Sequence, residues 1–373
     1  MRILQVVTRS ETGGGQSVVA NLAAELYARG HEVAIASGPE GGGEAWLGLD
    51  KGIELFDIKG LVRDISPLNE LRAVGSLGGL YRSYRPDIVH LHTSKAGFLG
   101  RLAPGFPKDK IVYTMHGYFQ LRDINRKFLL VDKALRKLCG AVVAVSRNDE
   151  RLMDEDGYRS VYVANGIPDL RGRARPPAGM ALRLKEIRER GLPVVMVIAR
   201  DANFKRLDLA REAARRLEGR ALLVWIGGEP EADDPPSFLA LGECPQASAC
   251  LEFADIYLQP SNHEGLSMAL LEALCAGLPC VASSVGGNLE TLGLDPNGTP
   301  DDGSAGPFES DRGFLVPNDA GVMAEVLGRL AADAALRTRM GLAARAAWRE
   351  RYSSAAMAEG YLSLYKTLAG GRG

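Results

Sequence analysis

The sequence predicts an α/β protein of two Rossmann-like, doubly wound domains that face one another across a cleft. Its 373 residues are more than one ordinary hydrophobic core holds. Short apolar runs alternate with stretches of helical period along the whole chain, a pattern typical of parallel sheets covered by helices. A segment rich in Arg and Pro, 171–178, separates the two halves and is interpreted as a hinge linker.

The composition is that of a globular protein and excludes several classes. Hydrophobic residues make up 46% of the chain and the net charge is -1, so nothing indicates a nucleic-acid partner. The five cysteines are an odd number without the spacing of metal ligands, and Cys275 and Cys280 read as core residues. No apolar run is long enough to span a membrane, and the N-terminus enters a strand at once. We therefore expect a cytoplasmic protein.

Both halves show strands followed by helices. In the first half we expect strands at 2–7, 33–37, 53–58, 87–92, 111–115, 141–145 and 161–164, with helices at 16–29 and 68–84. In the second half we expect strands at 193–199, 221–226, 256–258, 279–282 and 313–317, and helices at 206–217, 268–276, 320–332, 335–351 and 354–368. Residues 294–312 read as a loop, and a loop of that length is functional or disordered.

The most informative stretch is 261–277. Ser267 is a good helix N-cap and Gly277 a good stop, and the helix between them is apolar all round except for Glu272. A buried carboxylate needs a partner, so Glu272 is a candidate ligand-binding residue. Glu264 precedes it by eight residues and lies just before the helix. The alternative is a buried helix whose Glu is satisfied by a backbone amide or an Arg.

The amides that open this helix are also candidates. Gly265, Leu266 and Ser267 place free N–H groups at a helix N-terminus, which attracts anions and phosphate in particular. Arg200 and Lys205 follow the strand at 193–199 and precede a helix, so they would form a cationic pocket at the ligand edge of the sheet. The alternative is ordinary surface charge at a helix start.

Two features of the first half point to its ligand edge. A glycine triplet, 13–15, follows the first strand and lets backbone approach a ligand, although its spacing is not that of a dinucleotide fingerprint and a plain tight turn is the alternative. His116 ends the strand at 111–115 and is followed by Gly117, which favours a role at the site over that of a satisfied core histidine. Lys95 reads as part of a capped surface helix.

Residues 122–138 interleave basic and apolar side chains. Such a stretch binds an anionic membrane surface or forms an ordinary solvated helix with its apolar face on the sheet, and the sequence leaves both interpretations open.

The paired glutamates, Glu264 and Glu272, with the Arg200/Lys205 pair resemble the signature of retaining glycosyltransferases of the GT-B fold, closest to glycosyltransferase family 4. The resemblance implies hexosyl transfer from a nucleotide-diphosphate sugar, with UDP as the commonest nucleotide, to a glycan, glycolipid or small-molecule acceptor. It implies retention of the anomeric configuration and no divalent metal or other cofactor. It also implies domains at 1–170 and 171–352, with 353–373 crossing back to the first.

The resemblance assigns roles residue by residue. Glu264 lies beside the donor sugar, the amides of Gly265, Leu266 and Ser267 hold the diphosphate with Arg200 and Lys205, and Glu272 binds the ribose hydroxyls. His116 lies against the donor sugar and on the acceptor side, and the glycine-rich loop puts Gly14 on the acceptor side and Gly15 by the donor phosphate. The resemblance thus makes His116, Glu264, Arg200 and Lys205 the catalytic set. A basic patch such as 122–138 is common in relatives that use lipid-linked acceptors at the inner face of the membrane.

The chain departs from the family in two places. Residues 230–250 are short, acidic and proline-bearing where the family has a longer helical segment beside the base, so no base-contacting residue is assigned. The Pro and Gly usual around the Lys are absent near Lys205. Two other functions stay open: a nucleotide-sugar 2-epimerase of the same fold, and a non-catalytic module that binds a nucleotide sugar.

Overall fold

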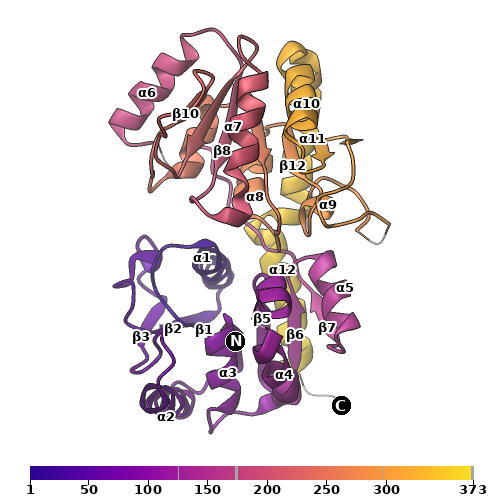
Figure 1. Cartoon of the computed structure of the whole chain (residues 1–373). Helices are drawn as coiled ribbons and strands as arrows, with labels where there is room; N and C mark the ends of the chain where they lie inside the picture. The colour runs from indigo at the N-terminus through magenta and orange to yellow at the C-terminus, as the bar shows by residue number, and fades with distance from the viewer. Residues whose placement is uncertain (125, 173–174, 297, 371–373) are drawn as a thin grey trace. The chain divides into compact units, whose positions relative to one another are not determined.

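The protein consists of two compact units, each built on its own seven-stranded sheet (Figure 1). The computed structural model describes residues 1–124, 126–172, 175–296 and 298–370. The first unit is Met1–Pro168 with the C-terminal segment from Ser353, and the second is Asp169–Tyr352. Residues 173–174 of the expected linker lie outside the described residues.

The sheet of the first unit has the order β3-β2-β1-β4-β5-β6-β7 and is parallel throughout. The strand order reverses between β1 and β4, which is where a doubly wound sheet opens a crevice. Its strands are β1 (Arg2–Val7), β2 (Glu32–Ser37), β3 (Glu54–Asp57), β4 (Ile88–His92), β5 (Ile111–Met115), β6 (Ala141–Ala144) and β7 (Ser160–Tyr162).

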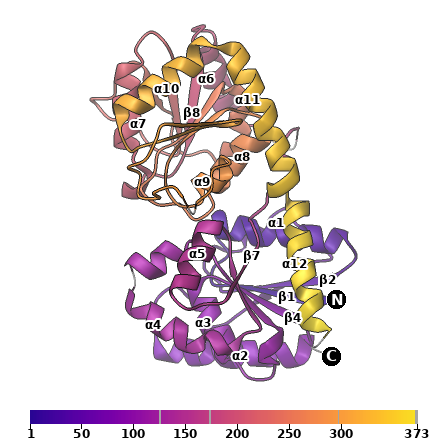
Figure 2. The ribbon, with the colours of Figure 1, turned by 90° about the vertical axis from the view of Figure 1, so that its right-hand side faces the viewer.

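Helices cover both faces of this sheet. Leu4 and Val6 of β1 share a core with α2 (Pro67–Tyr84) and α3 (Ser94–Leu102). The opposite face meets α1 (Gly14–Ala28) and α12 (Ser354–Ala369), and Figure 2 shows α12 lying along β4. There the strands carry buried polar residues: His90 Nδ1 is 2.5 Å from the Tyr365 hydroxyl of α12. The remaining helices are α4 (Arg126–Leu135) and α5 (Arg147–Glu155).

The sheet of the second unit has the order β10-β9-β8-β11-β12-β14-β13, and within it the β13–β14 pair is antiparallel. Its strand order reverses between β8 and β11. Its strands are β8 (Val194–Ile198), β9 (Leu222–Ile226), β10 (Phe238–Ala240), β11 (Ile256–Gln259), β12 (Cys280–Ser283), β13 (Phe308–Ser310) and β14 (Gly313–Val316). Its helices are α6 (Ala178–Arg188), α7 (Leu207–Arg216), α8 (Met268–Ala276), α9 (Asn288–Thr291), α10 (Ala320–Ala332) and α11 (Ala334–Ala347).

The expected class, two Rossmann-like α/β domains, is confirmed, and some expected boundaries are wrong. The segment 230–250 contains β10, and the expected loop 294–312 contains β13 as well as Asn297, which lies outside the described residues. Both are three-residue strands at the edges of the sheet, where pairing with a neighbour decides the conformation. The helix expected to end at 351 ends at Ala347 and continues as a π-helical turn, Trp348–Tyr352. No helix of the described residues is both long and apolar enough to cross a membrane.

Candidate active site

The candidate residues of the second unit lie where its strand order reverses. Arg200 and Lys205 follow β8, and Glu264 with the start of α8 follows β11, which is the neighbour of β8 in the sheet. In open α/β sheets, ligands bind outside the carboxyl ends of the strands at this reversal point. The sheet therefore brings together two motifs that are far apart in the sequence.

Three contacts join these loops directly, one of them a 3.1 Å hydrogen bond from Arg206 to Asn262 Oδ1. The amide of Asn262 donates a 2.8 Å hydrogen bond to the carbonyl of Phe204, and Lys205 Nζ lies 2.6 Å from Glu264 Oε1. The contact of Lys205 with Glu264 is a charge-assisted hydrogen bond, which is about twice as strong as a neutral one. The cation of one motif is thus held by the carboxylate of the other.

Three side chains hold the carboxylate of Glu264. Its side chain is 8% exposed, and its Oε1 accepts hydrogen bonds from Lys205, from Gln259 Nε2 (2.8 Å) and from Ser261 Oγ (2.6 Å). Gln259 ends β11 and Ser261 follows it, so the strand itself fixes this carboxylate. Three donors therefore converge on one oxygen of this carboxylate.

The backbone of Glu264 is held from the opposite side by the turn after β12. Gly286 has φ +46, and a Cβ there would lie 1.9 Å from the Glu264 carbonyl oxygen. The amide of Gly287 donates to the same oxygen over 3.2 Å. Close approach of two backbones is the physical reason for glycine at Gly286.

Helix α8 begins and ends as the sequence predicts. Ser267 is the N-cap, and its Oγ accepts a hydrogen bond from the amide of Leu270; Gly277 has φ 80 and ends the helix. The Ser267 hydroxyl also lies 3.2 Å from Gln259 Oε1. Within the described part of the chain, the amides of Gly265, Leu266 and Ser267 donate to no other residue. The helix therefore presents free N–H groups, which suit an anion.

Glu272 lies on α8, partly buried, and its carboxylate has no hydrogen-bond partner among the described residues. Burial raises the pKa of Glu272 to about 7, because removal from water disfavours the charged form. The alternative in which a backbone amide or an Arg satisfies this Glu is therefore not what is observed. An unpaired carboxyl with a pKa near neutrality is typical of a ligand-binding position.

Arg200 is exposed and makes no ion pair with any described residue. It follows the end of β8, where Gly227 allows the loop after β9 to approach closely: a Cβ on Gly227 would lie 2.3 Å from the carbonyl oxygen of Ala199. The guanidinium is therefore available to a ligand at the carboxyl ends of the strands.

Asn318 is a site neighbour that the sequence reasoning missed. Its Nδ2 donates to the carbonyl of Ser261 over 3.1 Å and to Asn262 Oδ1 over 3.2 Å, and its Oδ1 accepts from Ser283 Oγ over 2.6 Å. It follows β14, so a polar residue just after a strand was the available signal. Asn318 braces the loop that carries Glu264.

In the first unit, Gly14 and Gly15 differ from the expected loop: both belong to the first turn of α1, with Gly13 as the N-cap. The physical reason is that an extended Gly13 can end the loop before the triplet is complete. A Cβ added to Gly15 would meet no atom within 4 Å among the described residues. Packing against the described residues therefore does not require glycine at this position.

His116 follows β5 in the same unit and joins a chain of hydrogen bonds. Its Nε2 is 3.1 Å from His92 Nδ1, and His92 Nε2 is 2.5 Å from Gln5 Oε1. Burial lowers the pKa of His116 to about 4, so the imidazole is neutral near pH 7. Its Nδ1 is buried without a partner among the described residues, and such an atom is free to bind a ligand hydroxyl.

Thr93 marks the reversal point of this sheet. It has φ 78, an uncommon value for a β-branched residue, and its hydroxyl is 2.7 Å from that of Thr8. The bond links the loop after β1 to the loop after β4. Backbone strain of this kind clusters at functional sites. Lys95, on α3, pairs with Glu70 over 3.4 Å and donates to the Asp64 carbonyl, as expected for a surface helix rather than an anion site.

The basic stretch 122–138 folds as part of a π-helical segment (Gln120–Ile124), as α4 and as a short 3-10 turn, with Asn125 outside the described residues. On α4, Leu129 and Asp132 are buried, whereas Phe128, Leu130 and Val131 are exposed. A solvated helix with its apolar face on the sheet would bury these residues. The helix therefore presents apolar and basic side chains to its surroundings together.

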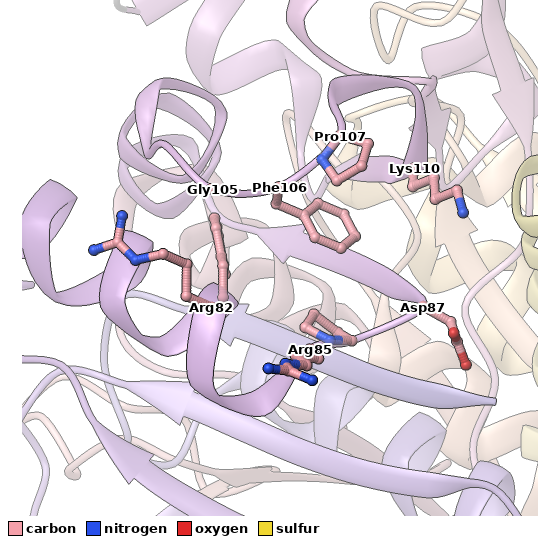
Figure 3. A pocket seen from close by; sticks show the side chains of 9 residues that line it. Arg82, Arg85, Asp87, Gly105, Phe106, Pro107 and Lys110 are labelled. Atoms are coloured by element: carbon pink, nitrogen blue, oxygen red, sulfur yellow. The ribbon is translucent and has the colours of Figure 1, made fainter.

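A separate hollow of about 510 Å³ lies at the amino-terminal ends of β4 and β5 (Figure 3). Figure 3 shows Arg82 and Lys110 on opposite sides of the Phe106 ring, with Asp87 near Lys110. It lies at the strand edge opposite to Gly15 and His116, and no predicted site residue lines it. We therefore do not assign it to the site.

The predicted site residues thus form two groups. Arg200, Lys205, Glu264, Glu272 and the amides of 265–267 gather at one strand edge of the second unit; Gly14, Gly15 and His116 lie at the corresponding edge of the first. Among the described residues, no group of three or more His, Cys, Asp or Glu side chains is placed to hold a metal ion.

Two family models match the chain. Residues 12–170 match the model of Glycosyltransferase Family 4, and residues 192–333 match that of Glycosyl transferases group 1. The first match lies in the first unit except for its last two residues, 169–170, and the second match lies within the second unit.

Curated relatives are named glycosyltransferases. The UDP-Gal:alpha-D-GlcNAc-diphosphoundecaprenol alpha-1,3-galactosyltransferase of Escherichia coli is 28% identical over 270 residues, which are 64% of this chain and 68% of that protein. The O-antigen biosynthesis glycosyltransferase WbnH of Escherichia coli is 26% identical over 316 residues, 80% of this chain and 86% of that protein.

Solved structures share the fold over almost the full length. Anabaena HepE in complex with UDP-glucose superposes with a TM-score of 0.77 at 16% identity, covering 98% of this chain and 100% of that one. The sucrose-phosphate synthase of Thermosynechococcus elongatus gives a TM-score of 0.76 at 19% identity, covering 98% of both chains. The chain therefore has the GT-B fold, matches a glycosyltransferase family 4 model in its first part and a glycosyl transferases group 1 model in its second, and is an enzyme of the glycosyltransferase class.

Proposed function

We propose that the protein is a retaining glycosyltransferase that moves a sugar from a UDP-sugar to a hydroxyl of a glycan, glycolipid or small-molecule acceptor. The observation that carries this proposal is the convergence of Arg200, the Lys205–Glu264 pair and the free N-terminus of α8 at the reversal point of the second sheet. These groups form a site for a diphosphate with a carboxylate at each end.

The chemistry follows from where charge develops. When an acceptor hydroxyl attacks the anomeric carbon, the bond to the departing diphosphate breaks and negative charge grows on its oxygens. Lys205 and the amides of 265–267 are donors held in place around that position, and the exposed Arg200 is a further donor beside them. Such preorganised donors stabilise a transition state more than a ground state and supply the larger part of many rate enhancements. No divalent metal is required in this scheme.

The two carboxylates give the site a direction. Glu272, unpaired on α8, would accept hydrogen bonds from the ribose hydroxyls, and Glu264 would lie beside the sugar with Lys205 at the diphosphate. His116 would hydrogen-bond the donor sugar through its free Nδ1, with Gly15 by the donor phosphate and Gly14 on the acceptor side. The choice of UDP is supported by the UDP-glucose complex of Anabaena HepE and by the UDP-galactose in the name of the E. coli relative.

Protection against heat tests the donor. The melting temperature should rise with UDP and with one or more UDP-sugars, and rise less with GDP or ADP. Incubation of that donor with candidate acceptors, followed by proton NMR, should give a product of the donor's own anomeric configuration, in EDTA as well as without it. Inversion would refute retention, and loss of activity in EDTA would refute the metal-free scheme. If the protein forms an epimer from the donor alone, it is an epimerase and the proposed transfer is wrong.

We further propose that the protein works at the inner face of a membrane, through the surface that α4 presents. Ile124, Phe128, Leu130 and Val131 are exposed, and Arg126 and Lys127 on the same helix have no carboxylate partner among the described residues. Apolar side chains that enter the headgroup region and cations that attract anionic lipid act together on such a surface. The diphosphoundecaprenol in the name of the E. coli relative is a lipid-linked acceptor and supports the idea.

Vesicle sedimentation tests this surface. The protein should pellet with phosphatidylglycerol vesicles at low salt, remain in solution with phosphatidylcholine vesicles, and be released by added salt. The Leu130→Asn variant should bind the vesicles more weakly, whereas Leu182→Asn, on α6 of the second unit and also exposed, should bind as the parent does. Absence of the parent from the anionic pellet at low salt would exclude the membrane surface.

A further inference from the structure

A pocket of about 440 Å³ lies beside α4 in the first unit, and the proposed chemistry does not account for it. The segments that form it follow β3, β4 and β5, so it lies at the same strand edge as Gly15 and His116. Its volume falls within the range of small-molecule sites, about 300–1,000 Å³. Its apolar lining consists of Ile65, Phe98, Leu121, Phe128 and Val131.

Three of the five apolar side chains of the pocket, those of Ile65, Phe128 and Val131, are exposed, whereas Leu121 is buried and Phe98 is half-buried. Phe128 is 42% and Val131 45% exposed, and Ile65 is more exposed still. Apolar side chains left in water around a concave surface cost free energy that a hydrocarbon ligand would recover. These exposed residues come from two separate segments, the loop before α2 and the outer face of α4. The exposed apolar surface is therefore shared by the walls of the pocket and does not belong to one segment alone.

Most charged side chains that line the pocket are held in ion pairs. Lys95 is paired with Glu70, and Asp132 is paired with the buried Arg101. The guanidinium of Arg63 makes no ion pair with a described carboxylate, and the backbone amide of Arg63 donates to Glu40 Oε2 over 2.9 Å. Another hollow, formed by α4 together with residues that precede it, includes Arg126 and Lys127 from the start of the helix. The pocket is thus apolar with a positively charged edge.

We propose that this pocket binds the hydrocarbon chain of a lipid-linked acceptor, next to the point where the chain carries its phosphate or diphosphate. The apolar lining takes the first part of the chain, and Arg63 binds the anionic group by charge-assisted hydrogen bonds. This rests on the proposed membrane-side transferase function, and it names the class of acceptor as a hydrocarbon phosphate. It also places the acceptor's sugar end toward the strand edge that carries His116.

Calorimetric titration of the full chain with farnesyl diphosphate, below the concentration at which it forms micelles, tests the pocket. The parent should bind farnesyl diphosphate at least about tenfold more tightly than inorganic pyrophosphate or farnesol, since each lacks one half of the ligand. Val131→Asn and Arg63→Gln should each weaken binding by about tenfold. Leu102→Asn is the matched control: Leu102 lies on α3, is 42% exposed, and does not line the pocket.

Two results would overturn the proposal: equal binding of pyrophosphate and farnesyl diphosphate, or unchanged binding in Val131→Asn. Neither result would refute the proposed donor site. That site lies in the second unit, and titration of UDP on the same samples tests it separately. Leu130→Asn separates the pocket from the membrane surface, because Leu130 lines the other hollow of α4. It should spare farnesyl diphosphate binding while it weakens vesicle binding. A parent that fails to bind farnesyl diphosphate but binds UDP refutes the pocket alone.

Discussion

Lys205 Nζ lies 2.6 Å from Glu264 Oε1, so the cation assigned to the diphosphate and the carboxylate assigned to the sugar are one bonded pair. This pair ties the loop after β8 to the loop after β11. Arg200, five residues before Lys205, is exposed and has no such partner among the described residues. Arg200 and Lys205 look equivalent in the sequence, but only Lys205 joins the two loops by an ion pair among the described residues.

The first prediction separates them. Arg200→Ala should reduce turnover by about 10²-fold, because it removes a donor aimed at developing charge, and should leave the melting temperature unchanged. Lys205→Ala should reduce turnover by a similar factor and also lower stability by about 1–3 kcal/mol, because Glu264 stays buried without its cation. Steady-state kinetics with thermal melts measure both effects. A double variant, Lys205→Met with Glu264→Gln, should recover part of the stability; equal melting temperatures for all the variants would contradict the pairing.

The second prediction concerns the direction of the nucleotide. Glu272→Gln keeps the shape but loses the charge, and a charged hydrogen bond exceeds a neutral one by roughly 1 kcal/mol or more, so affinity for bare UDP should fall about tenfold. Glu264→Gln leaves the ribose contact in place and keeps an oxygen that can accept from Lys205, so it should lower turnover while bare UDP binds nearly as before. Calorimetric titration of both variants with UDP and GDP measures this. If Glu264→Gln weakens bare UDP as much as Glu272→Gln, the assigned polarity of the site is reversed.

Part of this site could be predicted from the sequence because its determinants are local. Ser267 and Gly277 fix α8, whose interior is apolar apart from Glu272, and the expected bounds are those observed. The apolar runs likewise predict most strands, because buried parallel strands are almost continuously hydrophobic.

The rest depends on which strands become neighbours. The Lys205–Glu264 pair exists because β8 lies beside β11, and Asn318 meets Ser261 because β14 follows β12 in the sheet. Neither adjacency can be derived from local periodicity. The edge strands β10 and β13 are too short for a pattern of their own, and the positive φ of Thr93 runs against its residue type.

The third prediction concerns the anchoring of α4. Asp132 is buried on this helix and pairs with Arg101, and it also accepts a hydrogen bond of 2.8 Å from the Tyr158 hydroxyl. Breaking a buried pair leaves an uncompensated charge, so Asp132→Asn should destabilise the protein by about 3–5 kcal/mol. Urea unfolding followed by circular dichroism measures it. The control is Glu32→Gln, which breaks the exposed Arg2–Glu32 pair and should leave the midpoint unchanged. Equal midpoints for both variants would show that the buried pair does not anchor the helix.

The last prediction follows from the raised pKa of Glu272, about 7 against an ordinary value of 4.5. Because the folded protein holds this proton more tightly than the unfolded chain, folding is favoured at low pH, and that stability is lost as the pH rises from about 4.5 through 7. The Glu272→Gln variant does not titrate there. The difference in melting temperature between the variant and the parent should therefore shift in favour of the variant when the pH is raised from 5 to 8.

Binding of nucleotide should show the opposite dependence. Ribose hydroxyls that donate to the carboxylate stabilise its charged form and lower its pKa, so UDP should bind more tightly at pH 8 than at pH 6 and release protons on binding near pH 6.5. Titrations in buffers of different ionisation enthalpy count those protons. UDP itself loses a proton from its terminal phosphate near this pH, so the measurement is the difference between the parent and Glu272→Gln. An identical number of protons released by the two proteins would mean that Glu272 does not contact the nucleotide, and the ribose would have to be placed elsewhere on the second unit.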